Sequence, residues 1–266
     1  MRVAVVGHVE WIEFARVERL PAAGEIVQAI DVWEAPGGGG AVAAVQLGRL
    51  AGSCLFLTAL ADDELGHRAK SELEELGLRV EVSWHPGPQR RAFVHVDAGG
   101  ERTITVIGER LGPSGGEGLP WSELPGCDGV YFTAGDADAL RAARAARTLV
   151  ATVRAKPTLV RAGVQLDMLV ASSKDAGERY APGEIEPPPR FVAQTAGAAG
   201  GTLVAAGGSA STWTAAPLPG PPVNAYGAGD CFAAGLTFGL AEGRSPAEAL
   251  ELGARCGAAR VSERGP

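Results

Sequence analysis

The chain has 266 residues, of which 46% are hydrophobic and 21% are charged, and its formal net charge is −7. This length suits one large α/β domain or two small ones, and without a basic block nucleic acid or an anionic membrane is a poor expectation for the main partner. Because no stretch approaches the ~20 apolar residues of a membrane span and the N-terminus shows no signal-peptide pattern, we expect a cytoplasmic protein.

The four cysteines are widely spaced and form no CxxC pair, so we expect free, buried thiols at Cys54, Cys127, Cys231 and Cys256.

The first half of the chain predicts strands interrupted by glycine-rich turns. Residues 1–7 are a β-branched run that ends in glycine, which is typical of a buried strand. Residues 9–34 predict two extended segments joined by a turn at 21–25. The loop 36–40, which is rich in glycine, opens a helix over 41–50. A strand, a charged amphipathic helix and a hairpin around Gly99-Gly100 follow at 55–60, 62–76 and 91–107.

The second half predicts alternating strands and helices. Strands are expected at 129–133, near 148, at 166–170 and at 202–206, with helices at 137–147, around Leu159, and closing at 194–199. Two helices end the chain, at 228–241 and 246–261, and Ser245-Pro246 caps the second. This alternation favours a mostly parallel sheet with helices on both faces. The extended pairs at 9–34 and 91–107 have no helices between them and predict a small separate β-layer.

The segment VNAYGAGDCFAAGLTFG, residues 223–239, carries the strongest functional signal. A tight Gly227-Ala228-Gly229-Asp230 turn opens a helix of small and apolar residues. Free N–H groups at a helix start attract anions, and a carboxylate beside them can take a proton from an attacking hydroxyl. Phosphoryl transfer to an alcohol needs both parts. The alternative to an anion site is a structural role, in which the glycines let the chain turn into a helix that packs closely on a strand.

Other glycine loops carry weaker signals. Gly37–Gly40 lets a ligand approach the backbone closely, or is a flexible turn. Gly207-Gly208-Ser209 follows a predicted strand, and its position at a strand's carboxyl end is where ligands bind in open α/β sheets. The chain contains no Walker-type GxxxxGK[ST] motif, and the segment 7–12 after the first strand is not GxGxxG, so a P-loop enzyme and an NAD-binding oxidoreductase have little support.

Together these segments resemble the ribokinase (phosphofructokinase-B type) family of small-molecule kinases over almost the whole chain. Residues 36–50 look like the first signature of the family, and residues 227–235 match its second signature closely. Residues 61–77 look like its Gly-Asp-Asp segment, residues 100–107 like its lid strand, and residues 246–265 like its last helix and Arg-Gly ending.

The resemblance implies a three-layer α/β/α ribokinase-like fold, with a mostly parallel central sheet and a small β-sheet lid. Residues 1–266 would form one domain, with the lid drawn from about 9–34 and 91–107. Asp230 would be the catalytic base, and the backbone N–H groups of Gly227, Ala228, Gly229 and Asp230 would form the anion hole. By the same resemblance Glu10, Gly38, Gly39 and Asp230 would bind the acceptor, Gly207, Gly208, Ser209 and Gly257 would border ATP, and Asp175 would hold Mg²⁺ through water.

Several polar positions of the family are substituted in this chain. Val42 replaces the usual sugar-binding Asn, and Ile12 stands where an acidic residue is common. The magnesium motif Asn-x-x-Glu appears as residues 172–175 (SSKD), Asp-Thr-Thr as residues 224–226 (NAY), and Thr-Leu-Gly as residues 205–207 (AAG). Loss of a buried polar contact costs ~1–3 kcal/mol of binding, so a less hydroxylated or partly apolar acceptor is expected.

We therefore expect an ATP- and Mg²⁺-dependent kinase for a hydroxyl of a sugar-like or nucleoside-like small molecule. The alternative is a catalytically weak or inactive relative that acts as a ligand-binding or regulatory module. Trp11 and Trp33 either contact the acceptor or belong to the core of the lid or to a dimer contact. A homodimer through the β lid is expected to cover its exposed apolar face.

Overall fold

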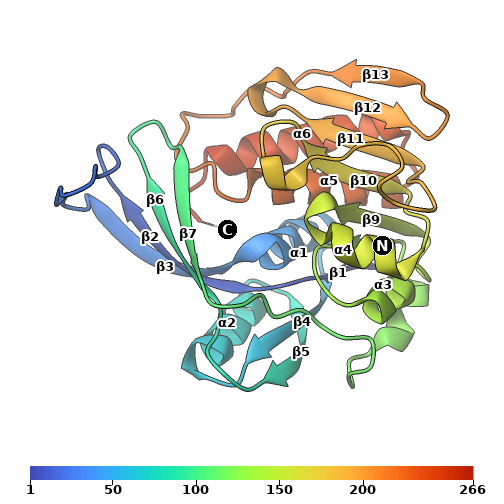
Figure 1. Cartoon of the computed structure of the whole chain (residues 1–266), viewed down its shortest axis with the longest axis horizontal. Helices are drawn as coiled ribbons and strands as arrows, with labels where there is room; N and C mark the ends of the chain where they lie inside the picture. The colour runs from blue at the N-terminus through green and yellow to red at the C-terminus, as the bar shows by residue number, and fades with distance from the viewer. Residues whose placement is uncertain (266) are drawn as a thin grey trace.

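Successive side chains of the first strand enter two different apolar layers. In β1 (Val3–Val6) the side chains of Val3 and Val5 join one buried cluster, whereas those of Ala4 and Val6 join another. This alternation is the geometry of a strand that is buried on both faces. A central sheet with helices on both sides follows from it, and the computed structural model, which describes residues 1–265, has this three-layer architecture (Figure 1).

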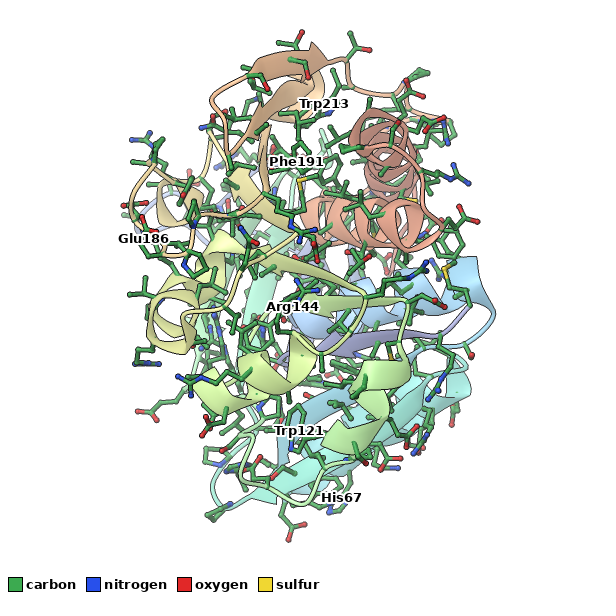
Figure 2. All side chains as sticks on the ribbon, turned by 90° about the vertical axis from the view of Figure 1, so that its right-hand side faces the viewer. His67, Trp121, Arg144, Glu186, Phe191 and Trp213 are labelled. Atoms are coloured by element: carbon green, nitrogen blue, oxygen red, sulfur yellow. The ribbon has the colours of Figure 1, made fainter. Side chains whose placement is uncertain are left out.

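The large sheet has nine strands in the order β13-β12-β11-β10-β9-β8-β1-β4-β5. The strands from β11 to β5 are parallel, while β12 and β13 are antiparallel additions at one edge. Their remaining bounds are β4 (Leu55–Ala61), β5 (Arg79–His85), β8 (Gly129–Phe132), β9 (Thr148–Thr152), β10 (Met168–Ser172), β11 (Phe191–Thr195), β12 (Gly201–Ala205) and β13 (Ala210–Trp213). In Figure 2, Trp213 marks the edge strand β13 at the top, and His67, whose ring lies against Trp84 of the other edge strand β5, is at the bottom.

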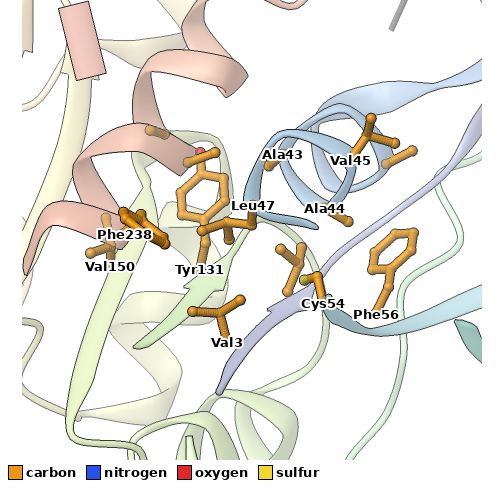
Figure 3. Close-up of a cluster of buried hydrophobic side chains, with 14 of the residues drawn as sticks. Val3, Ala43, Ala44, Val45, Leu47, Cys54, Phe56, Tyr131, Val150 and Phe238 are labelled. Atoms are coloured by element: carbon orange, nitrogen blue, oxygen red, sulfur yellow. The ribbon is translucent and has the colours of Figure 1, made fainter. Parts of the chain in front are cut away.

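The helices divide between the two faces of the large sheet. The Val3 layer is covered by α1 (Gly38–Ala51), α2 (Glu64–Glu75), α5 (Ala228–Ala241) and α6 (Pro246–Val261). The Ala4 layer is covered by α3 (Ala137–Ala143) and α4 (Lys156–Ala162). Figure 3 shows part of the first layer, where Ala43 and Leu47 of α1 meet Val3, Tyr131 and Phe238. Short 3₁₀ turns occur at Trp121–Gly126, Val153–Ala155, Ala176–Glu178 and Gly197–Ala199.

A second, four-stranded sheet projects from the core with the order β3-β2-β6-β7. Its strands are β2 (Glu10–Arg16), β3 (Asp31–Gly37), β6 (Arg91–Val96) and β7 (Arg102–Ile107). This small sheet, on the left of Figure 1, is built from the two extended pairs that the sequence predicts as a separate β-layer. A third apolar cluster joins it to α1 and α5 through Ile12, Phe14, Val42, Tyr226 and Cys231.

Most elements lie where the sequence places them, but two predicted helices were wrong and two strands were missed. Residues 191–195 form strand β11, so no α-helix closes at 194–199. Only the 3₁₀ turn Gly197–Ala199 follows the strand, between Gly197 and Gly200, which both have positive φ. The strands β5 and β13 were missed because each lies at a sheet edge and has few fully buried positions. The helix expected over 137–147 ends at Ala143, before the residues that lead into β9.

Candidate active site

The turn 227–230 forms the N-terminus of α5. Gly227 has φ +78°, and a Cβ there would lie 2.8 Å from Cγ1 of Val42, so only glycine fits. Within residues 1–265 the N–H groups of Gly229 and Asp230 make no hydrogen bond. That of Ala228 donates to the carbonyl of Ala225 at 3.3 Å, so it is partly engaged. Two free N–H groups at a helix start form an anion-binding position.

Small residues hold α5 between the sheet and α6. A Cβ at Gly235 would lie 2.7 Å from Sγ of Cys256, and a Cβ at Gly239 would lie 2.9 Å from Cα of Ala249. The two helices therefore pack closely over most of their length. Gly257 of α6 lies against the start of α5, where its Cβ position is 3.0 Å from the carbonyl oxygen of Ala228.

The glycine loop at the start of α1 reaches the same place. The position of a Cβ on Gly39 is 2.7 Å from Oδ1 of Asp230, and that on Gly38 is 3.1 Å from the backbone nitrogen of Glu10. The N–H group of Gly38 donates to the hydroxyl of Tyr226 at 2.7 Å. The two glycine-rich turns, far apart in the sequence, therefore meet around the Asp230 carboxylate.

A buried polar cluster lies beside this meeting point at the start of β2. Nε of Arg90 donates to Oε1 of Glu10 at 2.6 Å, and Nε2 of His8 lies 3.8 Å from the same oxygen. His8 and Glu10 are both buried, and Nδ1 of His8 has no hydrogen-bond partner among the residues described. Burial, together with the charges of Arg110 and Arg90, keeps the pKa of His8 well below its usual value. A neutral His8 with a free ring nitrogen can accept or donate a hydrogen bond.

The carboxylate of Asp230 has a pKa above its ordinary value. Burial raises the pKa of Asp230 to about 6, and the negative charge of Glu178 adds to the rise, while Arg154 and Arg102 oppose it. A carboxylate with a pKa near the working pH suits a general base, because it is ionised at neutral pH and still accepts a proton.

The expected metal ligand Asp175 already has partners. Nη2 of Arg154 lies 2.5 Å from Oδ2 of Asp175, and the N–H group of Gly177 donates to Oδ1. Arg154 also binds Glu178. Among residues 1–265, no group of three or more His, Cys, Asp or Glu side chains has an arrangement that could hold a metal ion. Asp175 and Glu178 do not fit a protein-built Mg²⁺ site in this conformation.

The predicted ATP loop at Gly207, Gly208 and Ser209 lies at the wrong edge of the sheet. Strand β12 is antiparallel to β11, so the turn after it lies beside the start of β11, where Ala206 donates to the carbonyl of Arg190. Figure 1 shows this turn between β12 and β13 on the right, away from the small sheet. The expectation that these residues lie at the carboxyl edge of the sheet was wrong, because the strand before them runs backwards.

The turn that does lie at the carboxyl edge is 195–200. Thr195 ends β11 in register with Ser172, which ends β10, and Ser173 donates to the carbonyl of Thr195. The sequence Thr195-Ala196-Gly197 fits the Thr-Leu-Gly pattern better than residues 205–207 do. The prediction missed it because residues 194–199 were assigned to a helix.

The substituted sugar positions are part of the core. Ile12 and Val42 are at most 1% exposed and belong to the cluster under the small sheet. Trp11 is also buried, beneath the guanidinium of Arg68, and Trp33 stacks on Phe14 with the ring centroids 4.8 Å apart. The interpretation as lid core therefore agrees with the structure for Trp33, whereas Trp11 packs in the cluster between the large sheet and its helices.

Three comparisons place the chain among known proteins. The model of the pfkB family carbohydrate kinases matches residues 1–153 and 162–266. A ribokinase of Dictyostelium discoideum is 32% identical over 108 residues, which are 40% of this chain and about a third (34%) of that relative.

Two solved structures are similar along almost the whole chain. A microbiome-derived acarbose kinase has a TM-score of 0.80 at 21% identity, over 98% of this chain and 93% of that one. The ribokinase of Arabidopsis thaliana, solved with ribose and ATP, has a TM-score of 0.75 at 20% identity, over 99% of this chain and 93% of its own. At sequence identities this low, the structural similarity establishes the fold that the chain shares with these two proteins. Within residues 1–265, no helix is long and apolar enough to cross a membrane.

Proposed function

Because the chain belongs to the pfkB family of carbohydrate kinases, we propose that it transfers the γ-phosphoryl group of ATP to a hydroxyl of a sugar-like or nucleoside-like small molecule. The observation that carries this proposal is the position of Asp230. Its carboxylate touches the glycine loop of α1 and stands in the first turn of α5, beside two free N–H groups.

Asp230 acts as the base in this reaction. With a pKa of about 6 it is ionised at neutral pH, and it removes the proton of the attacking hydroxyl as the bond to phosphorus forms. The N–H groups of Gly229 and Asp230, aligned with the dipole of α5, stabilise the negative charge on the transferred group. Positioning and charge neutralisation are the main sources of rate in this chemistry.

ATP is expected along the carboxyl edge, from the turn 195–200 to the start of α5 near Gly257. Mg²⁺ would accompany the nucleotide and supply charge neutralisation at its phosphates. The carboxylates of Asp175 and Glu178 are paired with Arg154. Because of this pairing, Mg²⁺ would be held mainly by the phosphates of ATP rather than by these two carboxylates.

The acceptor is held on the side of His8 and Glu10. These two side chains, with the backbone of Gly38 and Gly39, are the polar groups gathered beside Asp230. Since Val42 lies in the core, it offers no contact to a sugar hydroxyl. An acceptor with fewer hydroxyl groups than ribose on that side fits this arrangement. The small sheet would act as the lid that excludes water when the acceptor binds.

The test is a thermal-shift and ADP-release screen of sugars, nucleosides and vitamin precursors with Mg·ATP, run on the wild type and on Asp230→Asn. A ligand that raises Tm and is phosphorylated by the wild type should bind Asp230→Asn with no turnover. Turnover by Asp230→Asn would contradict the role of the base. Calorimetry that detects no binding of Mg·ATP to the wild type would instead favour the ligand-binding module.

We also propose a cytoplasmic homodimer formed through the small sheet. Its edge strand β7 exposes Ile104, Val106 and Ile107, each at least 40% accessible in the single chain. Pairing with a second copy would cover this apolar edge. The four cysteines are free and buried, which agrees with a reducing compartment. Light scattering should give twice the monomer mass, and Val106→Lys should give the monomer.

A further inference from the structure

An arginine is buried without a salt bridge behind the 227–230 turn. Arg260, in the last turn of α6, is 2% exposed. Its Nε and Nη2 atoms have no hydrogen-bond partner among residues 1–265, and no salt bridge to it occurs in that part of the chain. Its one hydrogen bond runs from Nη1 to the carbonyl of Glu263 at 3.0 Å. The carboxylate of Glu263 pairs with Arg49, and its charge offsets only part of the effect of burial on the pKa of Arg260.

This guanidinium lies next to the turn. Nε of Arg260 is 3.6 Å from the Cβ position of Gly227, the residue that caps α5. The end of α6 is tied to the segment before the turn, because the carbonyl of Val261 accepts from the N–H groups of Val223 and Asn224. Asn224 in turn donates to the carbonyl of Arg264. Hydrogen bonds therefore hold the end of α6, which carries Arg260, against the segment that leads into the 227–230 turn.

A buried, unpaired cation lowers stability unless something compensates it. Burial lowers the pKa of Arg260, but a guanidinium stays protonated at neutral pH. A phosphoryl group at the turn would bring the missing negative charge close to it. A positive charge behind a helix N-terminus adds to the dipole that attracts the same anion.

We propose that Arg260 is a positioning residue for phosphoryl transfer, a fixed cation that strengthens the anion site at 227–230 from behind. It touches neither the acceptor nor the transferred group, and acts through the turn. This inference rests on the proposed function for the identity of the anion. It adds a residue of α6, outside both glycine loops, to the phosphoryl site.

The experiment compares the wild type with Arg260→Met and Arg260→Lys. Methionine keeps the apolar stem and removes the charge, while lysine keeps the charge. We expect Arg260→Met to have the same Tm as the wild type or a higher one, because a buried charge is lost. Its affinity for Mg·ATP by calorimetry should fall about tenfold, with the affinity for adenosine unchanged. Arg260→Lys should bind Mg·ATP within about threefold of the wild type.

Stability and binding together separate the possible outcomes. Tight Mg·ATP binding by Arg260→Met overturns the proposal. So does a lower Tm in both variants with equal losses for ATP and adenosine, since that pattern marks a packing role. If the wild type binds Mg·ATP but phosphorylates no acceptor, the kinase function fails while the binding comparison still decides on Arg260. A wild type that binds no Mg·ATP overturns both.

Discussion

The carboxylate of Asp230 fills the space in which a side chain on Gly39 would begin. Oδ1 of Asp230 is 2.7 Å from the Cβ position of Gly39, nearer than carbon atoms in contact approach an oxygen. Gly39 has no positive φ, so its backbone tolerates any residue. Glycine is therefore required at position 39 by the position of the carboxylate rather than by the backbone.

Gly39→Ala should displace the Asp230 carboxylate and lower kcat by about 100-fold, because a shift of about 1 Å in a catalytic group has that effect. Tm should change little. The matched control is Gly118→Ala, since Gly118 has no neighbour within 4 Å of its Cβ position and no positive φ. Steady-state ADP release measures both variants. Unchanged kcat in Gly39→Ala would show that Asp230 has room to move without loss.

The rate should depend on pH through Asp230. With a pKa of about 6, kcat/KM should be flat above about pH 7 and fall as the pH drops through 6, since the base must be ionised. Arg154 lowers this pKa and Glu178 raises it. Arg154→Gln should therefore move the acid limb to higher pH, and Glu178→Gln should move it to lower pH. Shifts in the same direction for both variants would contradict this electrostatic arrangement.

Asp230 should also reduce stability at neutral pH. An acid with a folded pKa near 6, above its ordinary value of 3.8, weakens the fold as the pH rises from about 4 to about 6. Asp230→Asn should therefore raise Tm by about 2–4 °C at pH 8, and this gain should vanish below about pH 4. Glu75→Gln, which removes an exposed carboxylate, is the control. An equal rise in Tm in both variants would contradict the prediction, because it would show that the loss of one negative charge from the protein is the whole cause.

The hydroxyl of Tyr226 should hold the two glycine-rich turns together. Tyr226→Phe removes the acceptor of the Gly38 N–H group, and a buried donor without a partner costs about 1–3 kcal/mol. Urea unfolding should show a loss of that size. Tyr180→Phe is the control, because the Tyr180 hydroxyl makes no hydrogen bond to residues 1–265. If Tyr226→Phe is as stable as the wild type, the prediction is contradicted, and a water molecule accepts the hydrogen bond of the Gly38 N–H group in place of the hydroxyl.

Local patterns were sufficient for the elements that carry the base. The helices 228–241 and 246–261 were predicted with the bounds that the structure has, because small residues at helical spacing and a Ser-Pro cap are short-range signals. The glycine turn and Asp230 belong to the same segment. The family resemblance followed from these residues and from the loop 36–40, and the family model confirms it.

Strand direction and long-range packing needed the tertiary structure. The sequence could not show that β12 runs antiparallel, which moves Gly207 away from the carboxyl edge and leaves the turn 195–200 there. Nor could it show that Val42 is buried in the core or that Arg260 lies unpaired behind Gly227. The sequence by itself determined which helix carries the carboxylate, because that depends on neighbouring residues. Only the tertiary structure decided what surrounds it, because those contacts join residues that are about 30 to 190 positions apart.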